Sequence, residues 1–182
     1  MGIPNLLTFL RIILIPVFIL LFYLPFRGSH VLAAIIFIFA AMTDWLDGYL
    51  ARSLGQVSKL GTFLDPVADK LIVVTALVLL VGDRVLPYLA IPAIVIICRE
   101  IMVSALREWM AEIGKRTRIA VTRIGQIKTT VQMLALILLL LYKPGAWFAL
   151  ALSGYLLLYL AALLTLWSMS LYLKAAWHDL SS

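Results

Sequence analysis

Four aspartates are the residues of this sequence whose type and spacing point most directly to chemistry. Asp44, Asp47, Asp65 and Asp69 fall within 26 positions and make up four of the nine acidic residues. Their spacings are i,i+3 and i,i+4, so each pair lies on one face of a helix. Oxygen ligands with no His or Cys nearby suit hard cations such as Mg²⁺ or Mn²⁺. Two such divalent ions would balance the four negative charges of the carboxylates. We therefore predict a site that binds two metal ions.

The acidic cluster has two other interpretations. The carboxylates could form interhelical salt bridges with Arg52, Lys59 and Lys70, but three cations would leave four acids net negative. They could instead line the pathway of a cation transporter, because intramembrane carboxylates often do so. Transporters commonly show internal repeats or paired broken helices, and neither is visible here. A metal-dependent enzyme is therefore the favoured interpretation.

Small and basic residues accompany the aspartates. Gly48, Ala51 and Gly61 each lie within about one helical turn of an aspartate. Such residues allow either close helix packing or the approach of a bulky ligand to the backbone. Arg52 could anchor the chain at the membrane surface, or it could contact a diphosphate beside the metal ions. The spacing alone leaves both choices open.

The elements that must carry these aspartates are membrane-spanning helices. Of the 182 residues, 64% are apolar and 13% are charged, and the mean hydropathy is +1.09. Soluble domains have about 25% charged residues, whereas a helix that crosses a membrane needs about 20 apolar residues. We therefore predict an all-α fold, a single domain over residues 1–182 with six transmembrane helices. The predicted spans are 6–25, 31–53, 63–81, 86–110, 119–142 and 147–173.

The basic residues predict how these spans are oriented. The second-to-third and fourth-to-fifth connections hold seven Lys and Arg residues, against three on the opposite side. Because Lys and Arg accumulate on the cytoplasmic side, we expect both termini to face the cytoplasm. The first apolar run lacks the features of a cleavable signal, so it is expected to remain as a span. The net charge of +6 forms no basic tract with interleaved aromatic residues, so no nucleic-acid partner is expected.

Three residues outside the acidic cluster have expected places. Cys98 is the only cysteine and lies inside an apolar run, so we expect it in the core. Glu100 and Glu108 are expected to pair with neighbouring arginines, because charged side chains at membrane depth need partners.

The acidic cluster also resembles a known signature. Eight fixed positions carry the likeness, in the pattern Asp44-x-x-Asp47-Gly48-x-x-Ala51-Arg52, eight residues, Gly61-x-x-x-Asp65-x-x-x-Asp69. This pattern is similar to that of the CDP-alcohol phosphatidyltransferases. The likeness covers almost the whole chain and is closest to the bacterial members whose acceptor is glycerol 3-phosphate. Further segments that carry it are 3–8 with Arg11, 65–70, 99–100, 107–112, 128–129 and 132–133.

The resemblance implies a reaction and a set of residue roles. The reaction is transfer of a phosphatidyl group from CDP-diacylglycerol to sn-glycerol 3-phosphate, giving phosphatidylglycerol phosphate and CMP. The four aspartates are implied as metal ligands, and Asp69 also as the catalytic base for the acceptor hydroxyl. The residues implied to contact CDP-diacylglycerol are Asn5, Thr8, Asp47, Gly48, Ala51, Arg52 and Gly61. From the residues alone, Asn5 could equally be the N-cap of the first helix.

The acceptor is the part of the reaction that depends most on the resemblance. Glycerol 3-phosphate is dianionic and needs cations, and we expect Arg107, Arg118 and Lys128 to bind its phosphate. Gln126 departs from the family pattern, which usually has a lysine there, and this weakens the assignment of the acceptor pocket. The same signature also occurs in family members that use another acceptor, so serine, inositol phosphate and phosphatidylglycerol are the alternative acceptors.

The resemblance also implies an assembly and a location. Members of this family are usually homodimers, with an active-site cavity that is open to the cytoplasmic side. We therefore expect a homodimer in the bacterial cytoplasmic membrane, surrounded by membrane lipids.

Overall fold

A computed structural model shows a bundle of helices with no strand among the described residues. It describes residues 3–26, 28–54, 59–83, 86–112, 123–142 and 148–180. Within these ranges the side chains of 3–5, 44–54, 59–60, 62–63, 65, 123–126, 172 and 174–180 are not described. The helices are α1 (Ile3–Tyr23), α2 (Ser29–Leu54), α3 (Lys59–Gly82), α4 (Ala90–Glu112), α5 (Arg123–Leu141) and α6 (Phe148–Leu180).

The helices agree closely with the predicted spans. Every boundary lies within four residues of its prediction except the end of α6, which continues seven residues past position 173. The prediction stopped where the apolar run gives way to polar residues, but a polar segment can remain helical. Two other helix ends carry residues that favour a boundary. Helix α2 begins at Ser29, a favoured capping residue, and α3 ends at Gly82.

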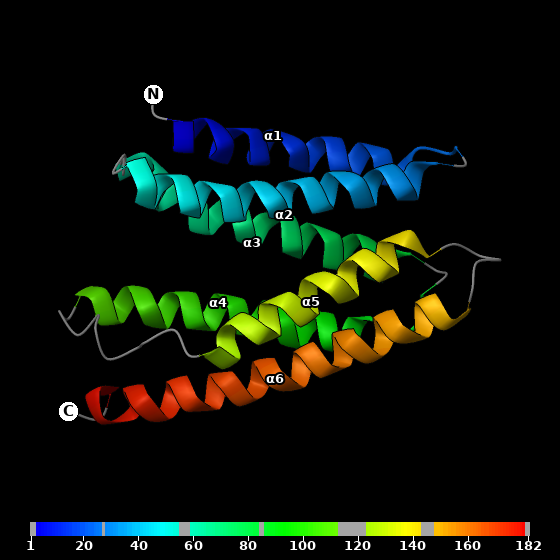
Figure 1. Cartoon of the computed structure of the whole chain (residues 1–182). Coiled ribbons are helices and arrows are strands. Elements are labelled where there is room, and N and C mark those ends of the chain that lie inside the picture. The colour runs from blue at the N-terminus through cyan, green and yellow to red at the C-terminus, as the bar shows by residue number, and fades with distance from the viewer. Residues whose placement is uncertain are drawn as a thin grey trace.

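The bundle has two halves, which Figure 1 shows one above the other. The first half is built from α1 packed on α2 and α3, and the second from α5 packed on α6, with α4 beside α6. Helix α2 contacts α5 and so joins the halves. Helix α1 begins and α6 ends at the same end of the bundle (Figure 1), as the prediction of an even number of spans requires.

Small residues bring the helices close together. Ala33, Phe37 and Ala40 lie at helical spacing on the buried face of α2, where the ring of Phe37 meets that of Phe18 with centroids 6.0 Å apart. On α6, a Cβ added to Gly154 would lie 2.8 Å from Cγ of Leu139. Helix α5 therefore approaches α6 closely at this glycine, as small residues allow in membrane bundles.

Gly154→Ala is expected to destabilise the fold by about 1–3 kcal/mol, because the added methyl group forces α5 and α6 apart. The measurement is the midpoint of thermal unfolding in detergent. Gly82→Ala is the matched control, since nothing lies within 4 Å of the Cβ it would add. Equal midpoints for the two variants would contradict the close approach at Gly154.

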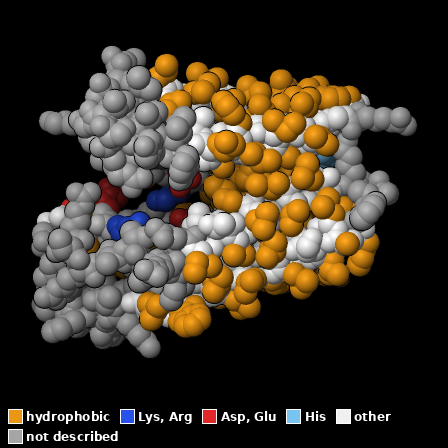
Figure 2. Space-filling model, viewed as in Figure 1, with side chains coloured by type: hydrophobic (Ala, Val, Ile, Leu, Met, Phe, Trp, Pro, Cys, Tyr) orange, Lys and Arg blue, Asp and Glu red, His pale blue; other side chains and the backbone are white. Residues whose placement is uncertain are grey.

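The polarity of the molecule is inverted relative to a soluble protein. Large apolar side chains are exposed along the helices, including Leu20 of α1, Ile94 of α4 and Leu163 of α6, and they cover much of the face in Figure 2. The side chains of Arg99 and Lys128 are buried instead. An exterior of this kind fits an apolar surrounding such as lipid.

Two helices pass a strict test for membrane spans within the described residues, over Leu6–Tyr23 in α1 and Phe148–Leu171 in α6. Helix α4 carries Arg99, Glu100 and Arg107 within its apolar sequence. The apolar stretches Ser29–Thr43 and Ile127–Leu141 are shorter. The all-helical fold is therefore confirmed for the described residues, whereas six membrane crossings remain a prediction.

The prediction for Cys98 was wrong. Its side chain is exposed on α4 and does not lie in the core. The prediction assumed that an apolar run marks buried positions. Where the exterior of a protein is itself apolar, hydrophobicity does not distinguish the outer face of a helix from the inner one.

Candidate active site

The predicted metal aspartates lie on two consecutive helices. Asp44 and Asp47 are in α2, and Asp65 and Asp69 are in α3, so both pairs have the helical spacing that the prediction requires. The side chains of Asp44, Asp47 and Asp65 lie outside the described residues. The side chain of Asp69 is described, is partly buried and lines a cavity.

The donor set that these four positions offer fits a hard divalent cation. All four are carboxylates, and they come from helices that are joined by residues 55–58 alone. Mg²⁺ and Mn²⁺ prefer such oxygen ligands. Among the described side chains no group of three or more His, Cys, Asp or Glu residues gathers. Three of the four candidate ligands lie outside that set, so the metal site remains a prediction.

The cavity beside Asp69 lies between α3, α4 and α5 and has a volume of about 60 Å³. Its polar lining comes from Asp69 and Lys70 of α3, Glu100 of α4, and Thr129 and Gln132 of α5. The rest of the lining is apolar. Figure 2 shows acidic and basic side chains inside a hollow at one end of the molecule, whereas the outer surface beside it is apolar. This part of the chain therefore offers a polar interior for a charged ligand.

Glu100 is the centre of a buried ionic network. Its Oε1 atom accepts a hydrogen bond of 2.9 Å from Nζ of Lys128 and one of 2.8 Å from Nη1 of Arg99. Nη2 of Arg99 donates a second bond, of 2.8 Å, to Oγ of Ser168. The network joins α4, α5 and α6. The two cations are only 5% exposed, and with one carboxylate between them the group carries a net charge of +1.

A second polar link joins α3 to α4 beside the network. Nζ of Lys70 donates a hydrogen bond to Oγ of Ser104, which donates in turn to the backbone carbonyl of Glu100, 2.6 Å away. The salt-bridge interpretation of the acidic cluster required Lys70 to pair with an aspartate. The position of its ammonium group counts against that interpretation.

Glu100→Gln is expected to destabilise the protein by about 2–3 kcal/mol, because Lys128 and Arg99 would remain buried without an anionic partner. Glu108→Gln is the matched control on the same helix. Glu108 is exposed and makes no ion pair with any side chain that the structure describes, so its replacement should change stability by about 0.5 kcal/mol or less. Thermal unfolding in detergent compares the variants, and equal midpoints would rule out a stabilising role for the network.

The predicted phosphate-binding cations differ in burial. Lys128 is buried and bonded to Glu100, whereas Arg107 is exposed on α4. Arg118 lies outside the described residues. The expected pairing of Glu100 with a neighbouring arginine is confirmed by its contact with Arg99. No ion pair of Glu108 is seen among the described side chains, and arginines such as Arg118 lie outside them, so its pairing stays a prediction.

The predicted nucleotide contacts are only partly described. Thr8 is buried in α1, and Gly61 is buried near the start of α3. Asn5 lies in the first turns of α1, but its side chain is outside the described residues. The side-chain environments of Gly48, Ala51 and Arg52 also lie outside them. The proposed contacts of these residues with a nucleotide therefore remain predictions.

Gln132 lies in a segment that carries the family resemblance, but no individual role was predicted for it. This residue lines the cavity with Asp69 and is almost fully buried, although its side chain is polar. Its position four residues after Lys128 places both on one face of α5. That spacing is the signal in the sequence that could have indicated a shared site.

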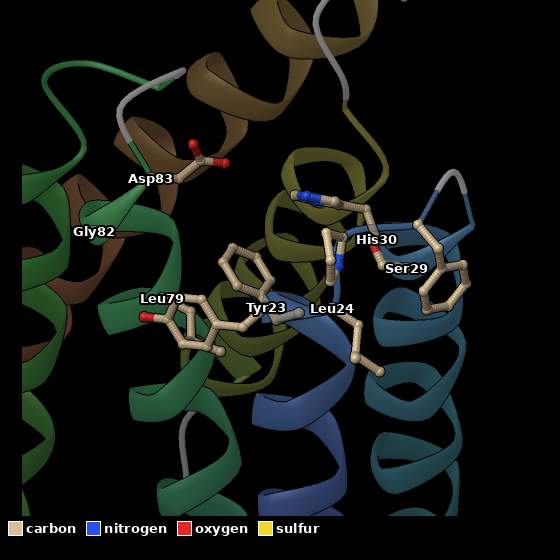
Figure 3. A pocket seen from close by; sticks show the side chains of 10 residues that line it. Tyr23, Leu24, Ser29, His30, Leu79, Gly82 and Asp83 are labelled. Carbon is tan, nitrogen blue, oxygen red and sulfur yellow. The ribbon is translucent and has the colours of Figure 1, made fainter.

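A larger cavity, of about 540 Å³, lies at the other end of the bundle (Figure 3). Tyr23 and Leu24 at the end of α1, His30 of α2, and Leu79 and Asp83 at the end of α3 are among its lining residues. The ring of His30 packs on that of Phe22, with centroids 5.0 Å apart. None of the described residues that line this cavity belongs to the predicted site, so size alone does not identify the active site.

Comparisons with known proteins agree with the resemblance. Residues 1–167 match the family model described as CDP-alcohol phosphatidyltransferase. Three relatives carry the name CDP-diacylglycerol–glycerol-3-phosphate 3-phosphatidyltransferase. The one from Pseudomonas fluorescens is 57% identical, over 100% of this chain and 93% of its own length. Those from Pectobacterium atrosepticum and Yersinia enterocolitica are 54% and 52% identical, over 98% and 99% of this chain and 97% of their own lengths. The chain belongs to the CDP-alcohol phosphatidyltransferase family.

Proposed function

We propose that this chain transfers the phosphatidyl group of CDP-diacylglycerol to sn-glycerol 3-phosphate, releasing CMP and forming phosphatidylglycerol phosphate. The observation that carries the proposal is the identity of 52–57% to relatives named for this reaction, over 98–100% of the chain. The described cavity supports it, because Asp69 and Glu100 line it and Glu100 holds the ammonium group of Lys128. A phosphorylated acceptor needs a cationic site close to a proton acceptor.

The proposed chemistry is a displacement at phosphorus. The terminal hydroxyl oxygen of glycerol 3-phosphate forms a bond to the phosphorus atom that carries diacylglycerol. The bond from that phosphorus to the CMP oxygen breaks, and CMP leaves with the electron pair. Asp69 accepts the hydroxyl proton as the new bond forms. Such reactions ask the protein mainly for positioning and for stabilisation of negative charge.

The proposed metal ligands are Asp44, Asp47, Asp65 and Asp69. Two bound Mg²⁺ or Mn²⁺ ions would neutralise charge on the diphosphate and on the leaving oxygen. The spacing of the aspartates within α2 and α3 supports this assignment.

The residues proposed to bind the donor and those proposed to bind the acceptor come from different parts of the chain. The residues assigned to CDP-diacylglycerol are Asn5, Thr8, Asp47, Gly48, Ala51, Arg52 and Gly61, from α1 to α3. For the acceptor phosphate we assign Arg107, Arg118 and Lys128. Lys128 donates one hydrogen bond to Glu100, and its ammonium group has three donors in all. It can therefore hold Glu100 and a phosphate oxygen together.

The proposed location is the bacterial cytoplasmic membrane. We propose six spanning helices, with the active site and both termini towards the cytoplasm; the apolar exterior and the basic connections support this arrangement. A homodimer is proposed on family resemblance. The partners are then the two substrates and the surrounding lipids.

The test of this function is a product analysis. The purified chain in detergent is incubated with CDP-diacylglycerol, Mg²⁺ and glycerol 3-phosphate, and the lipid product is identified by mass spectrometry. We expect phosphatidylglycerol phosphate and CMP in equal amounts. CMP formed together with phosphatidic acid would show hydrolysis of the donor and would overturn the proposal.

A further inference from the structure

We propose that Gln132 determines acceptor specificity by hydrogen bonding to the central hydroxyl of glycerol 3-phosphate. The inference rests on the proposed function and adds to it a residue that recognises one group of the acceptor. The observation behind it is that the side chain of Gln132 is buried and lines the cavity beside Asp69.

Gln132 is a buried polar residue that faces the cavity. It is 4% exposed and is part of the cavity lining. Its carboxamide makes no hydrogen bond with any residue that the structure describes. Buried polar side chains in folded proteins are normally hydrogen bonded. A carboxamide that finds no such partner in the protein and borders a cavity is suited to bind what enters the cavity.

The spacing along α5 matches the length of the acceptor. Lys128 and Gln132 are four residues apart, so they share a helix face and are separated by about 6 Å along the axis. Lys128, whose hydrogen-bond partner Glu100 lines the cavity, is the proposed contact of the phosphate, and Gln132 reaches the carbon chain. Asp69 lines the same cavity from α3, and its carboxylate is the proposed acceptor of the proton of the terminal hydroxyl. In this arrangement the central hydroxyl of glycerol 3-phosphate lies beside the carboxamide of Gln132.

The chemistry of the two groups is complementary. A hydroxyl donates one hydrogen bond and accepts others, and a carboxamide offers two donors and one acceptor oxygen. The cavity of about 60 Å³ has room for about four to six water positions. It therefore suits a short chain bearing hydroxyl groups better than a six-membered polyol ring, and the nucleotide must bind elsewhere.

The experiment compares two acceptors in the wild-type protein. One is glycerol 3-phosphate and the other is 3-hydroxypropyl phosphate, which keeps the phosphate and the terminal hydroxyl but lacks the central one. Without that hydroxyl, Gln132 is left buried against the substrate with no partner. We expect kcat/KM for CMP release to be about 10- to 100-fold lower with the analogue.

Gln132→Met then tests whether this residue is responsible. The substitution keeps the length of the side chain and removes its polar atoms. The expected ratio of kcat/KM between the two acceptors falls to within about threefold, because the variant has no group that recognises the hydroxyl. The KM for CDP-diacylglycerol should not change. Ser153→Ala is the control, since the bonds of Ser153 within the described residues go to backbone carbonyls of its own helix α6.

Each result bears on the proposal. A wild-type ratio near one would overturn the inference without the use of any variant, and so would a large ratio that persists in Gln132→Met. A large ratio that collapses only in Gln132→Met supports the inference. Absence of CMP release by the wild type with glycerol 3-phosphate, while another acceptor works, would refute the proposed function itself.

Discussion

Asp69→Asn is expected to lower kcat by about 10²- to 10⁴-fold, the range that general-base catalysis contributes. The amide cannot accept the hydroxyl proton, although it keeps the size of the side chain. The carboxylate lies in the cavity between α3, α4 and α5, where the acceptor hydroxyl is proposed to bind. Because the other three aspartates remain, some metal binding should persist. The measurement is the initial rate of CMP release at saturating concentrations of both substrates.

Asp83→Asn is the matched control for this prediction. Asp83 follows α3 at the opposite end and lines the larger cavity there (Figure 3). Its replacement should leave the rate close to that of the wild type. Normal turnover in Asp69→Asn would remove the assignment of the base and leave the metal site as a separate question.

Removal of divalent metal is expected to abolish activity, with a loss of at least about 10³-fold. The diphosphate and the four carboxylates would otherwise repel one another at low dielectric. Dialysis against EDTA followed by addition of Mg²⁺ or Mn²⁺ should restore the rate. Asp65→Asn should prevent this recovery, because an amide is a weaker ligand than a carboxylate for a hard cation.

Metal binding can be measured apart from turnover. Electron paramagnetic resonance of Mn²⁺ titrated into the purified chain should report about two bound ions per chain, following the charge of the four carboxylates. Fewer or weaker sites are expected in Asp65→Asn. Unchanged Mn²⁺ binding in that variant, or full activity in EDTA, would be incompatible with the proposed ligand set.

The helices were predictable because their signals are local. Apolar runs interrupted by residues such as Gly82 and Pro144 located every helix boundary to within four residues except the end of α6. The faces of the helices were less predictable, as Cys98 shows. In a molecule with an apolar exterior, both faces of a helix are hydrophobic, so burial depends on packing and not on composition.

The predictability of the site residues also depends on whether the signal is local in the sequence. The aspartates could be recognised because they are close in sequence, and their helical spacing is set by local geometry. In the Glu100 network the pair with neighbouring Arg99 was predicted, but the other bonds were not, since Lys128 is 28 residues and Ser168 is 69 residues from its partner. Such contacts depend on how α4, α5 and α6 pack. Gln132 stands in a segment that carries the resemblance, but its burial and its place in the cavity came only from the structure.

The most direct test of the proposed function is CMP release by the purified chain in detergent with CDP-diacylglycerol and Mg²⁺. Glycerol 3-phosphate, serine, inositol phosphate and phosphatidylglycerol are supplied singly. We expect release only with glycerol 3-phosphate, and none with any acceptor in Asp65→Asn. Release with a different acceptor would contradict the proposed substrate, and no release with any acceptor would contradict the proposed transfer reaction.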